Sequence, residues 1–273
     1  MSAIAQVGRV SFGRLRHPLR GGTGRTRKGS RFVEIGSLIG GLVLWEVLGR
    51  TLALPFLPPF SACLAALVDL NNQNLIIPDL IDSVQALAVG FVGCLAVSLI
   101  LAFLMAEFEL VNLAVGPYVY AFFLLPSIAI APVFLAIFGV SNLTRTGIIF
   151  IYPLFYMVLN FHTAFTQRDA GLLEMAQSYQ ASRWQRSRFV VIPSALPLVM
   201  ATIRVGLSRA VKGMINGEQF IAVYGLGGLV QTFGGQFAAD KVFAVIIVIV
   251  ALALVLDVIT RLLDQRWTRW ATP

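Results

Sequence analysis

Residues 174–197, EMAQSYQASRWQRSRFVVIPSALP, form the one long polar stretch with helical spacing in a chain that is otherwise strongly apolar. Of the 273 residues, 58% are hydrophobic and only 12% are charged. A soluble domain carries about twice that charged fraction. The composition therefore predicts an integral membrane protein, and the polar stretch is expected to lie outside the bilayer between two spans.

Apolar runs of about 20 residues, long enough to cross a bilayer as a helix, occur on both sides of this stretch. We predict an all-α membrane fold of six spans, because a helix satisfies its own backbone polar groups in lipid. The predicted spans are 32–54, 83–106, 111–138, 146–165, 198–217 and 242–263. They divide the chain into a basic tail at 1–31, a transmembrane domain at 32–265 with an insert at 168–197, and a C-terminal tail at 266–273.

Basic residues indicate the orientation. Eight of the 21 Lys and Arg residues precede Phe32, and such clusters beside a first span are retained in the cytoplasm. Six spans then return the C-terminus and the insert to the same side, and only Arg50, Arg145 and Lys241 fall in predicted outer loops. We therefore expect a multi-pass protein of a bacterial inner membrane with both termini cytoplasmic. A nucleic-acid partner is not expected, since the basic tail offers no fold and no aromatic stacking residues.

Two of the predicted spans carry packing and shape signals. In the second, Ser98, Ala102 and Ala106 recur every four residues, a spacing that lets another helix approach closely. The third contains Pro126 and Pro132, and a proline in a membrane helix removes a backbone bond and tends to kink it. The kink indicates either a helix that lines a pathway of changing shape or a purely structural bend.

The fifth span carries Arg204, Arg209 and Lys212 at predicted membrane depth, where each charge costs roughly 3 kcal/mol on insertion scales. Arg204, Ser208 and Lys212 are spaced by four and share one helix face. This face is either a binding stripe for an anionic solute or a structural feature. In the structural interpretation, Arg204 reaches the cytoplasmic surface and Lys212 pairs with Glu218 or with a carboxylate of another helix.

The polar insert itself is predicted to form two short helices. Ser182 and Gln185 have the spacing of a capping box that starts the second helix, and Pro193 and Pro197 are expected to end it. An amphipathic helix of this kind either lies on the lipid surface or docks onto a partner. The apolar face of the first helix comprises Leu172, Met175, Ala176 and Tyr179.

The register of this insert resembles the "EAA" loop of ABC importer permeases, written E-A-A, three residues, G, nine residues, I-x-L-P. Residues 174–176, Gln180 and 190–193 occupy the corresponding positions. Met175 replaces the second-position Ala and Gln180 replaces the Gly, which puts the turn geometry in question because Gln adopts positive φ less freely than Gly.

Further segments resemble permeases of the nitrate, sulfonate and taurine branch over nearly the whole chain after residue 32. They are Trp45-Glu46, 57–66, Leu125-Pro126, Ala131-Pro132, 138–145, 181–184, 218–220 and 225–227. The last of these lies in a glycine-rich segment after Glu218, which composition predicts to be a flexible outer loop. In the family this region approaches the outer end of the pathway and the solute-delivering protein.

The resemblance implies a transmembrane permease subunit of an ATP-driven, binding-protein-dependent importer. Its partners would be two cytoplasmic ATPase subunits that bind ATP and Mg, a second permease copy, a periplasmic or lipid-anchored binding protein, and the lipid bilayer. The implied ATPase-docking residues are Glu174, Met175, Ala176, Gln180, Ala181, Ser182 and Arg183. The candidate pathway residues are Pro126, Pro132, Arg204, Ser208, Lys212 and Glu218.

The chain offers no motif for its own ATP hydrolysis or other catalysis. The nearest glycine pattern, GRTRKGS at 24–30, lacks the phosphate-loop Lys and follows no strand, so no bound cofactor is expected. A secondary carrier or channel would need its own coupling-ion site, and Asp257 is the sole carboxylate deep in the last span. The solute predicted first is a small anion such as a sulfonate or nitrate, with a thiamine-precursor, riboflavin-like or aromatic solute as the alternative.

Overall fold

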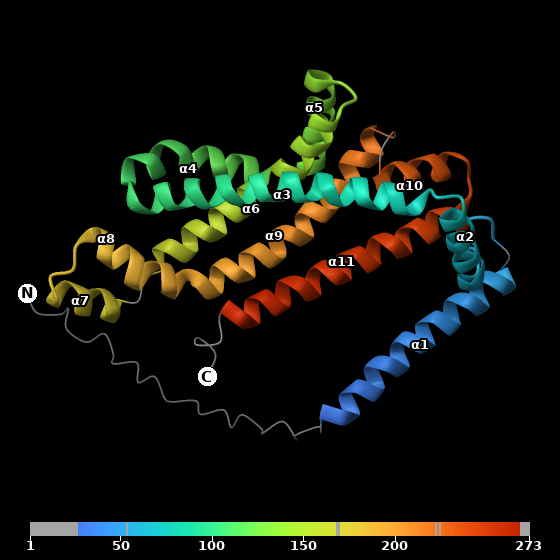
Figure 1. Cartoon of the computed structure of the whole chain (residues 1–273), viewed down its shortest axis with the longest axis horizontal. Coiled ribbons are helices and arrows are strands. Elements are labelled where there is room, and N and C mark those ends of the chain that lie inside the picture. Colours follow the sequence, from blue (N-terminus) through green and yellow to red (C-terminus); the bar gives the residue numbers. More distant parts are fainter. Residues whose placement is uncertain (1–26, 53, 168–169, 222, 224, 268–273) are drawn as a thin grey trace, which may run out of the picture. The chain divides into compact units, whose positions relative to one another are not determined.

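The computed structural model describes 27–52, 54–167, 170–221, 223 and 225–267, and these residues form helices without any β-strand (Figure 1). The elements are α1 Arg27–Leu52, α2 Phe60–Asn72, α3 Ile76–Glu107, α4 Glu109–Leu124, η1 Ser127–Ile130, α5 Ala131–Phe138, α6 Asn142–Thr166, α7 Ala170–Ser178, α8 Arg183–Arg186, η2 Ser187–Val191, α9 Ile192–Ile221, α10 Gly225–Gly235 and α11 Ala239–Trp267. The chain divides into two units, Met1–Leu44 and Trp45–Pro273.

Five described helices are long and apolar enough to cross a membrane, and a sixth span is present if a bent helix pair counts as one. The predicted all-α fold of six spans is thus confirmed. The long helices are Val33–Leu52, Ile76–Glu107, Asn142–Thr166, Trp184–Ile221 and Ala239–Trp267, and the bent pair is Glu109–Leu124 with Ser127–Phe138. Most of the predicted basic tail, at 1–26, and the last residues, 268–273, lie outside the described part of the chain.

The bent pair contains the third predicted span, and its halves meet at 100°. Leu125 adopts extended backbone angles, φ −70° and ψ 137°, as a residue before proline prefers. Pro126 begins η1 and Pro132 lies in the first turn of α5, where a proline fits because those N–H groups have no intrahelical acceptor. The kink predicted from proline is confirmed at Pro126, and it is a full break of the helix.

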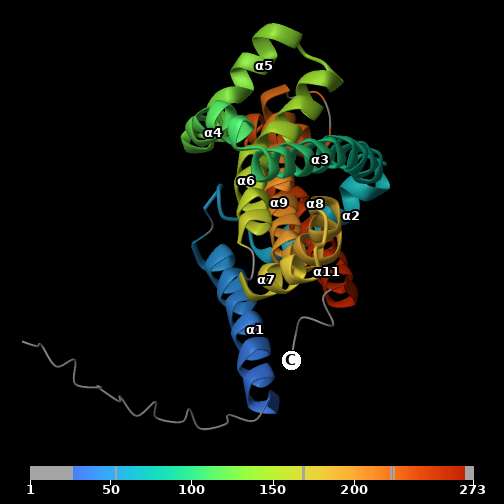
Figure 2. The same cartoon turned by 90° about the vertical axis from the view of Figure 1, so that its left-hand side faces the viewer.

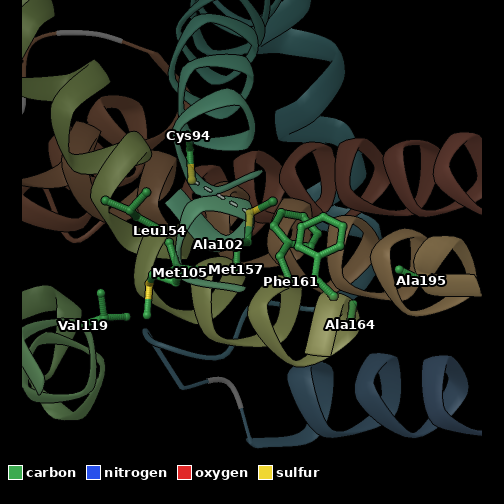
Figure 3. Packing of buried hydrophobic residues seen from close by; sticks show 11 residues of the cluster. Cys94, Ala102, Met105, Val119, Leu154, Met157, Phe161, Ala164 and Ala195 are labelled. Carbon is green, nitrogen blue, oxygen red and sulfur yellow. Dashed lines mark hydrogen bonds between the residues drawn. The ribbon is translucent and has the colours of Figure 1, made fainter. Parts of the chain in front are cut away.

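Helix α6 lies at the centre of the second unit and packs against both α3 and α9 (Figures 1 and 2). Figure 3 shows side chains of α3, α4 and α9 gathered around α6, with Met157 and Phe161 fully buried. The thiol of Cys94 on α3 lies 3.9 Å from the sulfur of Met157. Helix α9 comes so close to α6 that a Cβ added to Gly206 would lie 2.6 Å from that sulfur.

The predicted close packing of the second span is confirmed. Ser98 and Ala102 are fully buried in α3, and Ala106 packs against the cluster around α6. In lipid, helices associate through packing and not through a hydrophobic drive, so small residues of this kind stabilise the contact by letting backbones approach.

Two sequence-based predictions about helix ends are wrong. The glycine-rich segment after Glu218 is mostly a helix, α10, and not a flexible loop. Pro193 and Pro197 do not end the second helix of the insert, because the chain stays helical from Trp184 to Ile221. A π-helical turn, η2, ends at Val191, two residues before Pro193. Its wider hydrogen bonding accommodates a proline, which cannot donate and would clash with the carbonyl four residues earlier in a regular helix.

Candidate functional site

Helix α7 presents its surface outward. Glu174 is exposed, and the side chains of Met175 and Tyr179 are 53% and 81% exposed. Ala176 is half-buried, and the side chain of Leu172 lies outside the described part of the chain. The apolar face predicted for this helix is therefore largely uncovered in the single chain. Exposed apolar side chains on a polar helix are typical of a surface that another molecule covers.

The turn after α7 uses the positive-φ geometry that glycine would supply in the family pattern. Gln180 has φ +52°, so this chain adopts the left-handed conformation without glycine. The amide of Ala181 donates to the carbonyl of Ala176 at 3.0 Å, the bond that closes a Schellman helix end. An L-residue in this region costs about 1 kcal/mol relative to glycine.

We expect Gln180→Gly to strengthen this turn, because the replacement relieves the left-handed strain while keeping the backbone bond. Hydrogen exchange at the Ala181 amide is the measurement, and its protection should rise about fivefold, the equivalent of about 1 kcal/mol. Gln180→Ala is the matched control, since it keeps a Cβ and should give no rise. Equal protection in the wild type and the glycine variant would contradict the strain.

The predicted capping box is confirmed. The amide of Ser182 donates to the side-chain oxygen of Gln185 at 2.8 Å, and the amide of Gln185 donates to the hydroxyl of Ser182 at 3.3 Å. The two bonds satisfy donors that a helix start would otherwise leave open. Nothing is described for the side chain of Arg183, the last of the predicted docking residues.

The segment behind the turn is tied to α3. The buried Ser187 of η2 donates its hydroxyl to the carboxylate of Glu107, the last residue of α3, at 3.2 Å. From Trp184 the helix then continues without a break to Ile221, over 38 residues. The exposed helix α7 is thus connected by a capped turn to one continuous helix that runs the length of the bundle.

Three of the predicted pathway residues meet in one groove between α9 and α11. The groove has a volume of about 240 Å³, and Arg204, Ser208 and Lys212 all line it. Their shared face, predicted from spacing, is confirmed. Asp257 of α11 also lines this groove and accepts from Arg204 Nε at 2.7 Å and from Arg261 at 2.6 Å.

Arg204 thus pairs with a carboxylate of α11 while its side chain remains 38% exposed, and its reach toward the cytoplasmic surface stays a prediction. The neighbouring cation Arg209 also has a partner, because its guanidinium lies 4.2 Å from the centre of the Tyr156 ring on α6. The prolines lie elsewhere, at the break between α4 and α5, so Pro126 and Pro132 contribute nothing to the groove.

Glu218 lies apart from the groove, in a polar network that the sequence did not reveal. It is fully buried, accepts from the amide of Gly227 at 2.9 Å, and lies 3.7 Å from the guanidinium of Arg145. The expected pair with Lys212 is therefore wrong. Arg145 itself is only 3% exposed, in the first turn of α6 and not in an open loop, and it donates to Asp82 of α3 at 2.5 Å and 3.1 Å.

The same network caps the start of α10. Its first amides, those of Gly225, Leu226 and Gly227, donate to Asp79, Ser83 and Glu218 respectively. A helix start leaves such donors without intrahelical acceptors, and acidic partners there also complement the helix dipole. The signal in the sequence was the polar spacing of Asp79, Asp82 and Ser83 at the start of α3, of which only Ser83 lay within the span predicted at 83–106.

A Cβ on either glycine of this cap would collide with its surroundings. At Gly227 it would lie 2.5 Å from the carbonyl oxygen of Ile215, and at Gly225 it would lie 2.5 Å from the hydroxyl of Ser83. Gly225 also has φ +71°, a conformation that favours glycine. The glycine pattern read as a loop signal is therefore required for close packing of a capped helix.

Comparison with known proteins identifies the class to which these features belong. The family model described as "Binding-protein-dependent transport system inner membrane component" matches residues 95–269, more than half of the chain. The chain belongs to this family. The matched range contains the α7 segment, the groove and most of the polar network, and the resemblance inferred from the insert is confirmed. The chain is thus a permease component of a transport system.

Three relatives illustrate the range. The permease is 29% identical over 157 residues to the riboflavin transport system permease protein RibX of Chloroflexus aurantiacus, covering 58% of this chain and 59% of RibX. It is 25% identical over 232 residues to a probable ABC transporter permease protein of Brucella melitensis, covering 85% and 93%. It is 30% identical over 145 residues to the taurine transport system permease protein TauC of Escherichia coli, covering 53% of each chain. The matches thus span little more than half the length of RibX and of TauC.

A solved structure supports the fold. A chain of the MetNI methionine ABC transporter in an inward-facing conformation matches with a TM-score of 0.54 and 17% identity, covering 66% of this permease and 93% of that chain.

Proposed function

We propose that this permease is the transmembrane subunit of an ATP-driven importer, in which α7 docks onto a separate cytoplasmic ATPase subunit. The observation that carries the proposal is the exposed surface of α7, with Glu174 and Met175 outward, on a capped turn joined to a 38-residue helix. A docking helix needs both properties, since it must be accessible to the partner and must transmit force.

The connection explains how hydrolysis outside the membrane would act inside it. The capped turn at Ser182 fixes the angle at which the chain leaves α7, and the bond from Ser187 to Glu107 holds the following segment against α3. The same continuous helix carries Arg204 and Lys212 into the groove. A displacement of α7 is therefore passed along α9 to the groove.

The assembly that we propose contains two ATPase subunits, a second copy of this permease and a binding protein. The basic residues of the insert and of both tails favour a cytoplasmic location for these segments, and hence for α7. ATP and Mg belong to the ATPase subunits in this assembly. We assign the chain to a bacterial inner membrane with both termini cytoplasmic.

We propose a small anion as the solute. Lys212 and Arg204 line the groove with Asp257 as its one carboxylate, so the lining has more positive than negative charge. The relative named for taurine, a sulfonate, supports the anion, while the relative named for riboflavin supports the alternative of a larger ring.

Uptake into proteoliposomes tests this function. The permease is reconstituted with its ATPase and its binding protein, and radiolabelled taurine, nitrate and riboflavin are offered as separate probes. We expect uptake only when ATP is present on the side of the ATPase, and no uptake when the ATPase is left out. Uptake driven by a proton or sodium gradient without the ATPase would identify a secondary carrier and contradict the proposal. Transport of riboflavin alone would retain ATP coupling and overturn the anion.

A further inference from the structure

We propose that Lys212 is the recognition site for the anionic group of the transported solute, held in the groove between α9 and α11. The inference deepens the proposed function and rests on it, since it assigns a residue and a chemical class to the passage. The ligand class is a small singly charged oxyanion, such as a sulfonate or carboxylate group.

The charges that line the groove leave Lys212 without a carboxylate partner. Asp257, the one carboxylate of its lining, accepts from Arg204 and Arg261 through separate oxygens, at 2.7 Å and 2.6 Å. Both carboxylate oxygens are therefore engaged by guanidinium groups. The ammonium of Lys212 has no counter-charge within the groove.

Other cations of the spans have partners within the chain. Arg209 stacks on Tyr156, and Lys241 lies 5.5 Å from the ring of Phe233. Arg145 donates to Asp82. Among the described residues of the chain, neither a carboxylate nor an aromatic ring contacts the exposed ammonium of Lys212. Its partner therefore lies outside the described residues or is water.

Lys212 lies beside the middle of the apolar run of α11, far from either end of that run. Lys212 shares the groove with Ile249, the middle residue of the uninterrupted apolar run from Val242 to Leu256 on α11. About 10 Å of helix separates Ile249 from the nearer end of that run. A lysine at such a depth is costly unless it faces a water-filled cavity or an anion, and such residues mark solute pathways.

The size and the lining of the groove suit a small organic anion. A volume of about 240 Å³ is enough to hold a small anionic group. Apart from its charged residues and the hydroxyls of Ser208 and Thr260, the lining is aliphatic. The hydroxyl of Ser208 already donates to the carbonyl of Arg204 at 3.2 Å. The ammonium is thus the cationic donor of the lining that has no carboxylate beside it, and the aliphatic walls suit the short carbon chain of an organic anion.

A lysine footprint tests the site without requiring transport. The purified complex of permease and ATPase, in nanodiscs of phosphatidylcholine, is treated with acetic anhydride, with and without methanesulfonate, and acetylation is read by mass spectrometry. We expect methanesulfonate to slow acetylation of Lys212 several-fold and to leave Lys241 unchanged. Dimethyl sulfone, a neutral molecule of the same shape, should protect neither residue at matched ionic strength. Equal effects at both lysines, or protection by the sulfone, would overturn the proposal.

Two further outcomes identify other anions. Protection of Lys212 without methanesulfonate, once phosphatidylglycerol is added to the nanodisc, would assign the ammonium to a lipid headgroup. A Lys212 that never reacts in the assembled complex would be covered by a second permease copy. Either result overturns the solute site while leaving ATP-driven import intact.

Uptake kinetics supply the functional arm. Lys212→Met should raise the KM for taurine uptake about tenfold or more, the loss expected for a charged hydrogen bond, whereas Lys212→Arg should retain most of the affinity. Lys241→Met is the matched control and should leave KM unchanged. An unchanged KM in Lys212→Met, with ATP-dependent uptake preserved, would refute the site but not the proposed function.

Discussion

Arg145→Met is expected to lower the melting temperature of the purified permease by about 10 °C or more. Arg145 is 3% exposed, and its guanidinium faces both Asp82 and the fully buried Glu218. Removing one partner of a buried charge pair leaves the other without compensation and costs about 3–5 kcal/mol. For a protein of this size each kcal/mol corresponds to about 2–4 °C.

Glu218→Gln in the Arg145→Met background should restore part of the loss. A glutamine carries no charge to compensate, and its oxygen still accepts from the amide of Gly227. Arg50→Met is the matched control, because the Arg50 side chain is 67% exposed in its pair with Glu46 and such pairs contribute about 0–1 kcal/mol. Size-exclusion chromatography after heating gives the melting temperatures. Similar values for Arg145→Met and Arg50→Met would contradict the buried network.

Local signals predicted much of the fold. Apolar runs gave the spans because lipid exposure demands long helices with internal hydrogen bonds. Ser182 and Gln185 form the predicted capping box, and Pro126 marks the predicted kink, since each acts through backbone groups a few residues away. The shared face of Arg204, Ser208 and Lys212 followed from helical periodicity alone.

Contacts between residues far apart in the chain could not be predicted from the sequence. The sequence predicts Arg145 in an outer loop. In the fold Arg145 instead donates to Asp82 of α3, which lies 63 positions earlier in the chain. The glycines at 225 and 227 are typical of a loop, and only the packed structure shows that they let a capped helix approach Glu218 and Ile215. Local rules predict that the helix ends at Pro193. The π-helical turn before it lets the helix continue, and no sequence pattern predicts that turn.

The second large effect concerns α7. We expect Glu174→Lys to reduce solute uptake about tenfold or more while ATP hydrolysis by the ATPase continues, because a reversed charge in a docking surface is costly. Glu174 is exposed on α7, so folding of the permease itself should not change. Glu109→Lys, the same replacement at an exposed position in the first turn of α4, is the matched control and should leave uptake intact.

Simultaneous measurement of ATP hydrolysed and solute imported in proteoliposomes, for the wild type and Glu174→Lys, tests the docking of α7 most directly. We expect the wild type to import solute in proportion to hydrolysis, and the variant to hydrolyse ATP with little import or to lose the ATPase from the complex. Unaltered uptake by Glu174→Lys in a normally assembled complex would contradict the assignment of α7 as the ATPase contact.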